Sequence, residues 1–248
     1  MGTQKIKVKV GYQLIGTLKV PLVVELLAKP MWLICGESGS GKSVLTQYLI
    51  NSLLEYSELE LYVADFKASG DYDGLSEHYA TFDDCIDLVD EFYQRFQKIK
   101  QERTGQKILL LFDEYASAVI WANGQNKELG KRLQNQISEI LMQGRSLPNG
   151  GAAWLWTILQ RPDAEFYAHG SRLNYFVTII MRDVSKSLRQ MLDISEEEIP
   201  AEHRADVGHG IILQSGKPPT AFIVPKIDLS ALRRLLKRKA DQKAQRSV

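Results

Sequence analysis

A glycine-rich loop that ends in lysine and serine constrains the fold of this chain more than any other feature. Residues 36–43 read Gly-Glu-Ser-Gly-Ser-Gly-Lys-Ser and match the pattern G-x-x-x-x-G-K-[ST] at every defined position. The loop follows an apolar run at 31–35, typical of a buried strand, and precedes a helical apolar pattern at 43–55. This context predicts a phosphate-binding site rather than an ordinary glycine-rich turn with a surface lysine.

The composition of the loop has a chemical explanation. Glycines let the backbone wrap closely around a phosphate, so that several N–H groups and the N-terminus of the next helix point at its oxygens. We expect Lys42 to contact the β- and γ-phosphates and Ser43 to bind Mg²⁺. The predicted ligands are ATP and Mg²⁺, and the predicted nucleotide-binding residues are Gly36, Glu37, Ser38, Gly39, Ser40, Gly41, Lys42 and Ser43.

A second acidic element follows the clearest strand pattern in the chain. The apolar run at 107–115 contains Asp113 and Glu114, and a carboxylate at the end of a buried strand is costly unless it has a partner. We expect Asp113 to bind Mg²⁺ and Glu114 to polarise the attacking water as general base. The alternative is an acidic helix cap after an ordinary strand, and the phosphate loop upstream favours the catalytic interpretation.

Polar residues also follow two other predicted strands. Gln160 comes after the apolar run at 152–159, and we expect it to contact the γ-phosphate or the water as a sensor; the alternative is a loop residue that closes the strand. Asp65 ends the run at 60–65 and Lys67 follows it, which indicates either a contact at the ligand edge of the sheet or a local ion pair. The glycine- and aspartate-rich residues 68–80 after them are expected to be flexible.

Strand and helix patterns alternate along the chain. Together with the loop at 36–43, this alternation predicts an α/β fold of the RecA-like P-loop NTPase class, with a mostly parallel sheet and helices on both faces. Further strands are predicted at 175–180 and 210–213, and helices at 83–103, 126–143, near 184–193 and at 228–245.

The two ends of the chain differ from this alternation. Lys5, Lys7 and Lys9 alternate with apolar residues, which predicts a half-exposed edge strand, and a second strand is expected within 17–27. The last residues are basic and lack a wide apolar face. We therefore predict an N-terminal β segment at 1–28, a RecA-like ATPase domain at 29–227 and a basic C-terminal helix or tail at 228–248.

The net charge, the cysteine count and the length of the apolar runs limit the kinds of partner that we expect. Lys and Arg number 31 and Asp and Glu number 30, so the bulk charge does not indicate a nucleic-acid partner. The two cysteines have no metal-binding spacing, which predicts reduced thiols and a cytoplasmic protein. No apolar run approaches the about 20 residues of a membrane span, so any membrane function is expected to need a membrane-bound recruiting partner.

These motifs, in this order, resemble the motor domain of the FtsK/SpoIIIE family of DNA translocases. Besides the loop at 36–43, residues 64–67 are similar to that family's aspartate-x-lysine segment, and residues 109–116 resemble its acidic strand. The most specific likeness lies at 159–193, where Leu188 intrudes between the expected serine and arginine. The matching positions there are Gln160, Arg161, Pro162, Gly170, Asn174, Ser187, Arg189, Leu192 and Asp193.

The resemblance implies an ATP-hydrolysing motor that translocates double-stranded DNA through a homo-oligomeric, hexameric ring. It also implies an arginine finger from the neighbouring subunit, for which Arg145, Arg172 and Arg189 are the candidates. We expect no transmembrane region, long linker or DNA-reading winged-helix module, and residues 144–154 depart from the family's usual pattern. A compact motor of a mobile element, plasmid or phage, as in conjugative coupling proteins of this type, is therefore expected.

Two alternatives stay open at this point. One is an ATPase of the same fold that translocates protein, as in type VII secretion. The other is a nucleotide-binding assembly subunit, against which the intact Lys42, Ser43, Asp113 and Glu114 argue. The basic tail is a further source of contacts to a DNA backbone, although a solvated charged end is the favoured interpretation. Its cations are Arg233, Arg234, Lys237, Arg238, Lys239, Lys243 and Arg246.

Overall fold

The computed structural model describes residues 5–247, without the side chains of the last two of them. Residues 1–4 of the predicted N-terminal segment, residue 248 and the side chain of Arg246 from the predicted basic tail lie outside the described part. The chain divides into two compact units, one made of Met1–Ser57 and Phe176–Val248 and the other of Glu58–Tyr175. The predicted phosphate loop belongs to the first unit and the predicted acidic pair to the second.

The first unit contains a sheet with mixed strand directions. Its strands lie in the order β2-β1-β10-β9-β8-β3, with β3 and β8 parallel and the other neighbours antiparallel. The parallel pair carries the phosphate loop, because β3 runs directly into it. The strands are β1 (Lys7–Ile15), β2 (Leu18–Glu25), β3 (Trp32–Cys35), β8 (Val177–Met181), β9 (His209–Gln214) and β10 (Lys217–Ile223).

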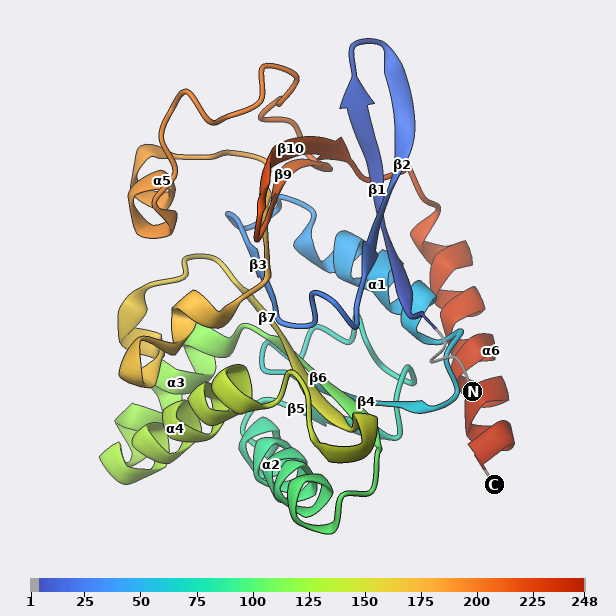
Figure 1. Cartoon of the computed structure of the whole chain (residues 1–248), viewed down its shortest axis with the longest axis vertical. Coiled ribbons are helices and arrows are strands. Elements are labelled where there is room, and N and C mark those ends of the chain that lie inside the picture. The colour runs from blue at the N-terminus through green and yellow to red at the C-terminus, as the bar shows by residue number, and fades with distance from the viewer. Residues whose placement is uncertain (1–4, 248) are drawn as a thin grey trace. The chain divides into compact units, whose positions relative to one another are not determined.

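Strands β1 and β2 form a hairpin at the start of the described chain (Figure 1). The predicted alternation is confirmed, since the lysines of β1 are exposed while Ile6, Val8 and Val10 are fully buried. The predicted edge position is wrong, because β1 lies between β2 and β10 and the edge strand is β2. The register of β1 with β2 shifts between Lys9 and Gly11, which marks a bulge. Gly11 has a φ of 151°, and a Cβ there would lie 2.4 Å from the carbonyl oxygen of Ile223. Only glycine therefore lets β1 approach β10 here.

Three helices accompany the strands of the first unit. They are α1 (Lys42–Leu53), α5 (Lys186–Leu192) and α6 (Leu229–Ser247), and α6 packs alongside α1 (Figure 1). The backbone N–H groups of Lys7 and Lys9 donate to Tyr56 Oη (2.9 Å) and Ser52 Oγ (3.2 Å). These bonds attach β1 to the C-terminal end of α1 and the residues after it.

The second unit contains a wholly parallel set of strands in the order β7-β6-β4-β5. Every residue of β7 is buried, and Trp154 and Trp156 belong to its core, as predicted. The register pairs Asp65 of β4 with Asp113 of β6, and Asp113 with Ile158 of β7. The strands are β4 (Leu59–Asp65), β5 (His78–Thr81), β6 (Lys107–Asp113) and β7 (Ala152–Leu159).

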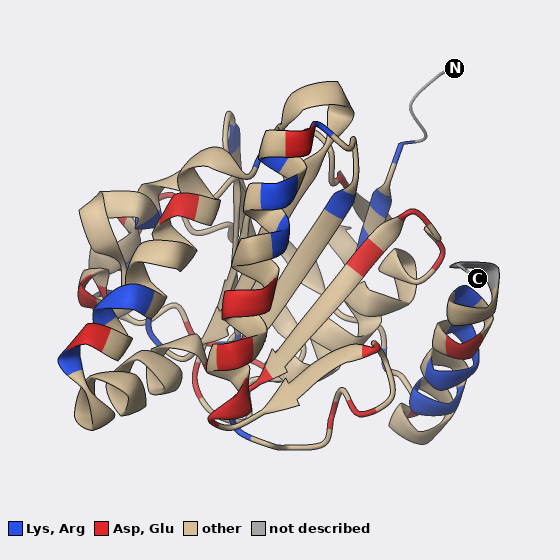
Figure 2. Ribbon diagram, turned by 90° about the horizontal axis from the view of Figure 1, so that it is seen from below, with Lys and Arg blue, Asp and Glu red and all other residues tan. Residues whose placement is uncertain are grey.

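Helices α2 (Asp84–Glu102), α3 (Tyr115–Gln125) and α4 (Lys127–Gln143) complete this unit, with short 3-10 turns η1 (Pro148–Gly150), η2 (Ala164–Phe166) and η3 (Ala168–Asn174). Helix α2 has acidic side chains in its first half and basic ones in its second, before the terminal Glu102 (Figure 2), and the acidic first turn suits the helix dipole. The predicted α/β class is confirmed. No helix between residues 5 and 247 has the length and apolar character needed to cross a membrane.

Candidate nucleotide-binding site

The predicted phosphate loop connects β3 to α1 in the first unit. Gly36, Gly39 and Gly41 have φ values of 144°, 74° and 98°, a region that side chains disfavour. A Cβ on Gly36 would lie 2.6 Å from the carbonyl oxygen of Met181 in the neighbouring strand β8. The glycines are therefore required for the loop to turn back from the buried strand.

Lys42 is the first residue of α1, and its side chain lies across its own loop. Its Nζ donates hydrogen bonds to the carbonyl oxygens of Gly36 (2.6 Å) and Glu37 (2.9 Å), and the residue is 9% exposed. No side chain caps the N-terminus of α1. The first N–H groups of a helix have no hydrogen-bond partners within the helix. The loop therefore holds both the Lys42 ammonium group and the uncapped N–H donors at the positive end of α1.

Ser40 supplies a test of whether this loop suits an anion. It is fully buried, and its Oγ has no hydrogen-bond partner within the described residues. A buried hydroxyl without a partner is unfavourable unless a ligand satisfies it. Together with the lysine and the helix N-terminus, this hydroxyl fits a bound phosphate group. Ser43 lies half-buried in the first turn of α1, one residue after Lys42.

A second segment of the first unit packs against this loop. The N–H of Gly208 lies 3.5 Å from the carbonyl oxygen of Ser40, and a Cβ on Gly41 would lie 3.8 Å from Cγ1 of Val207. The chain before β9 therefore borders the phosphate loop. No local sequence signal indicated this contact, because it joins residues that are far apart in the chain.

Asp113 ends strand β6 of the second unit and is only 5% exposed. Burial raises the pKa of Asp113 to about 7, and the nearby carboxylates of Glu114 and Asp65 add to this rise. Two hydrogen bonds oppose it, one from Tyr72 Oη to Oδ2 (3.1 Å) and one from the Glu114 N–H to Oδ1 (3.0 Å). A cation beside this carboxyl group would favour its ionised form.

Glu114 follows in a left-handed backbone conformation, with φ 56° and ψ 39°, and precedes the first residue of α3 without a capping hydrogen bond from its side chain. Such a conformation costs about 1–3 kcal/mol for a residue other than glycine and is concentrated at functional sites. Its carboxylate is half-buried and accepts no hydrogen bond from the described residues. The two successive acids thus differ: Asp113 is buried and held in place, and Glu114 is available to a ligand or to water.

Asp65 lies beside Asp113 in the register of β4 and β6 and is fully buried. Its Oδ2 accepts hydrogen bonds from Ser69 Oγ (3.1 Å), the Gly70 N–H (3.2 Å) and Tyr79 Oη (3.3 Å). Lys67 is exposed and forms no ion pair with Asp65 within the described side chains. The contacts of Asp65 therefore order the loop after β4, and the local ion pair is not observed.

Gln160, the predicted sensor, is exposed directly after β7. Strand β7 is parallel to β6, and Ile158 is the partner of Asp113. Gln160 therefore follows β7 at the same edge of the sheet at which β6 ends.

The three candidates for an arginine finger have different surroundings. Arg145 is exposed, and its carbonyl oxygen accepts a hydrogen bond from Trp154 Nε1 (3.2 Å). Arg172 donates to the carbonyl oxygen of Pro162 (2.6 Å), and Arg189 of α5 forms an ion pair with Glu196 (3.2 Å). Arg172 and Arg189 are thus held by contacts within the chain.

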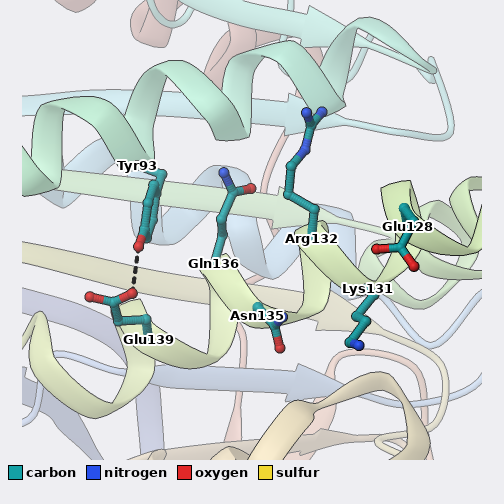
Figure 3. A pocket seen from close by; sticks show the side chains of 7 residues that line it. All are labelled: Tyr93, Glu128, Lys131, Arg132, Asn135, Gln136 and Glu139. Carbon is teal, nitrogen blue, oxygen red and sulfur yellow. Dashed lines mark hydrogen bonds between the residues drawn. The ribbon is translucent and has the colours of Figure 1, made fainter.

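A pocket of about 380 Å³ lies beside helix α4 in the second unit (Figure 3). Tyr93 of α2 lines it and donates a hydrogen bond to Glu139 of α4. The other lining residues, Glu128, Lys131, Arg132, Asn135 and Gln136, are polar or charged. None of the predicted site residues lines this pocket.

Solved structures of P-loop ATPases share this fold. The ATPase 2 and 3 region of EssC from Geobacillus thermodenitrificans matches with a TM-score of 0.71 and 14% identity, over 97% of this chain and 49% of that one. The type VII secretion ATPase EccC of Thermomonospora curvata matches at 0.68 and 18%, over 96% and 31%. The pCW3 conjugation coupling protein TcpA with ATPγS matches at 0.69 and 20%, over 96% and 72%.

The chain spans about half of the EssC chain and about a third of the EccC chain that it matches. No curated protein matches it significantly in sequence. The model of the FtsK/SpoIIIE family matches residues 3–139, which is more than half of the chain. The chain therefore belongs to the FtsK/SpoIIIE family, as a RecA-like ATPase domain.

Proposed function

We propose that this chain is an ATP-hydrolysing motor that translocates double-stranded DNA in the transfer or segregation of a mobile element, plasmid or phage genome. One observation supports nucleotide binding. The loop at 36–43 places Lys42, the uncapped start of α1 and the unsatisfied Ser40 hydroxyl together, in a chain of the FtsK/SpoIIIE family. This set of donors suits a triphosphate.

The roles of the site residues follow from their chemistry. Residues 36–43 would hold the phosphates, and Ser43 and Asp113 would hold Mg²⁺, which neutralises phosphate charge when bound. Glu114 would accept a proton from the attacking water, because its carboxylate has no competing partner within the described residues. Gln160 would contact the water or the γ-phosphate from the end of β7.

The choice of DNA as the moved polymer rests on two supports. Residues 159–193 resemble the pattern of DNA translocases, and TcpA, a conjugation coupling protein, shares the fold. A protein-translocating ATPase is the alternative, because EssC and the type VII secretion ATPase EccC share the fold as well. A nucleotide-binding assembly subunit is less favoured, because Lys42, Ser43, Asp113 and Glu114 are all present.

We further propose that the active form is a hexameric ring in the cytoplasm, with an arginine finger supplied by the neighbouring subunit. Arg145, Arg172 and Arg189 are the candidates for this role, and Arg172 and Arg189 bond to Pro162 and Glu196 of their own chain. A membrane-bound partner would recruit the ring where the function requires a membrane.

An ATPase assay with and without duplex DNA, at two salt concentrations, tests the proposal. We expect DNA to stimulate hydrolysis and the stimulation to fall at the higher salt, because phosphate contacts are salt-sensitive. Lys42→Ala is the control that should abolish activity under all conditions. Hydrolysis that ignores DNA at both salt concentrations would contradict DNA translocation and favour a protein substrate.

A further inference from the structure

Helix α6 (Leu229–Ser247) packs against the α1 region of the first unit along one of its faces. Leu232 and Leu236 are buried, and Lys239 Nζ donates to Asn51 Oδ1 (2.7 Å) and pairs with Glu55 Oε1 (3.1 Å) of the α1 region. These three positions recur at the spacing of helical turns and so lie on one face. The helix is therefore held in a fixed orientation, and its opposite face points away from α1.

The opposite face of α6 is basic. Arg233, Arg234, Lys237 and Arg238 are all exposed, and their spacing of four residues places them in two adjacent rows. Figure 2 shows the helix with bands of Lys and Arg along it and one acidic band, which is Asp241.

Charge is strongly segregated into this helix. Its sequence holds seven Lys and Arg and one Asp, a formal charge of +6. The whole chain carries only +1, so the other 229 residues sum to −5. A helix needs only a few charges to be soluble, and this excess forms a local positive surface on a chain that is otherwise acidic.

We propose that the outer face of α6, defined by Arg233, Arg234, Lys237 and Arg238, binds the phosphate backbone of duplex DNA. This inference rests on the proposed function, in which duplex DNA is the moved polymer. It assigns a DNA-contacting surface that is distinct from the residues of the nucleotide site. From Arg233 to Arg238 the helix axis rises by about 7.5 Å. Duplex DNA carries about four phosphates over that length, so the charge densities match.

An anionic membrane surface fits this face less well. A helix that lies in a membrane interface needs an apolar face that enters the lipid. The apolar residues Leu232 and Leu236 of α6 are instead buried in the protein. Arginine also suits phosphate oxygens well, because its planar guanidinium group donates two parallel hydrogen bonds.

The test is the salt dependence of binding to a short, mixed-sequence DNA duplex, measured by fluorescence anisotropy on the full chain. Arg234→Gln/Arg238→Gln removes two exposed cations spaced by one turn. The slope of log affinity against log salt should become shallower by about 1.8, since each phosphate contact contributes about 0.9. Arg234→Lys/Arg238→Lys should keep the slope of the unmodified chain, because the charge is retained.

The matched control is Lys127→Gln/Lys131→Gln, which removes two exposed cations with the same spacing from α4. It should leave the slope unchanged. Thermal unfolding of each variant confirms that the fold is intact, which is expected because all four side chains are exposed. An unchanged slope for Arg234→Gln/Arg238→Gln, or an equal loss in the control, would overturn the assignment of α6.

Two further outcomes separate this inference from the proposed function. If DNA stimulates ATP hydrolysis but the variant binds DNA with the original slope, the α6 surface is wrong and the DNA motor stands. If the unmodified chain neither binds DNA nor responds to it, both proposals fail. Binding to phosphatidylserine vesicles that depends on Arg234 and Arg238, with DNA binding unaffected, would overturn the assignment in favour of a membrane surface.

Discussion

The Tyr72 hydroxyl donates a 3.1 Å hydrogen bond to Oδ2 of Asp113, and both residues are almost completely buried. Tyr72 lies in the glycine- and aspartate-rich loop after β4, which the sequence indicates as flexible. The bond attaches this loop to the end of β6 and opposes the effect of burial on Asp113, whose pKa is raised to about 7. The loop thereby contributes to the charge state of the predicted metal ligand.

Tyr72→Phe should lower the free energy of unfolding by about 1–3 kcal/mol, because it leaves a buried carboxylate oxygen without its donor. Denaturant unfolding at neutral pH measures this loss. Tyr93→Phe is the matched control, since it also removes a tyrosine–carboxylate hydrogen bond, to Glu139, but at a partly exposed position. An equal loss of unfolding free energy in the two variants would show that burial does not make the Tyr72–Asp113 hydrogen bond more stabilising than a partly exposed one.

Lys42→Ala should abolish tight ATP binding, because the variant lacks the one side-chain cation of the phosphate loop. Titration with a fluorescent ATP analogue measures the affinity. Lys19→Ala, an exposed lysine of β2, is the control and should bind as the unmodified chain does. Because Lys42 also bonds to the carbonyl oxygens of Gly36 and Glu37, a thermal unfolding scan must accompany the titration. Unchanged affinity in a folded variant would refute the assigned role.

Glu114→Gln should keep ATP binding and lower turnover by about 10²–10⁴-fold, since the amide cannot accept the proton of the attacking water. Glutamine has nearly the same shape, so the left-handed backbone at this position should be kept. Steady-state hydrolysis and nucleotide titration, compared with Glu128→Gln on α4 as control, separate the two effects. Normal turnover in the Glu114 variant would mean that another group is the base.

His78 connects the edge strand β5 to its neighbours through two carboxylates. Its Nε2 lies 3.1 Å from Glu60 of β4, its Nδ1 lies 3.0 Å from Glu91 of α2, and its ring stacks on Tyr62 at 4.0 Å. The hydrogen bond to Glu60 raises the pKa of His78, against the opposing effect of burial. The same bond lowers the pKa of Glu60.

The stability that His78 contributes should be fully present below the ordinary histidine pKa of about 6.5 and lost as the pH rises through the raised pKa of the folded state. The effect should be about 1 kcal/mol or less, because these side chains are partly exposed. Denaturant unfolding at a series of pH values above about 6.5 should show a decline that His78→Gln removes. His169→Gln, an exposed histidine without a carboxylate partner in the described residues, should keep it.

Two of the described strands and one described α-helix were not predicted from the sequence, for separate reasons. Strand β5 has four half-buried residues and no alternating pattern, and it exists because it pairs with β4. Strand β10 contains Pro218 and Pro219, which disfavour a strand, yet both lie where its register with β9 shifts. Helix α3 is apolar without a helical period, so its sequence resembles a buried segment of either type.

The sequence by itself determined the phosphate loop, the acidic pair, the alternating lysine strand and the α/β class, because each depends on local spacing or on residues that are adjacent in the chain. Only the tertiary structure decided that Tyr72 bonds to Asp113, that Gly208 borders Ser40, and that α6 turns its arginines away from α1. These contacts join residues far apart in sequence. Their free energy comes from burial and hydrogen bonding across the fold, which no local pattern encodes.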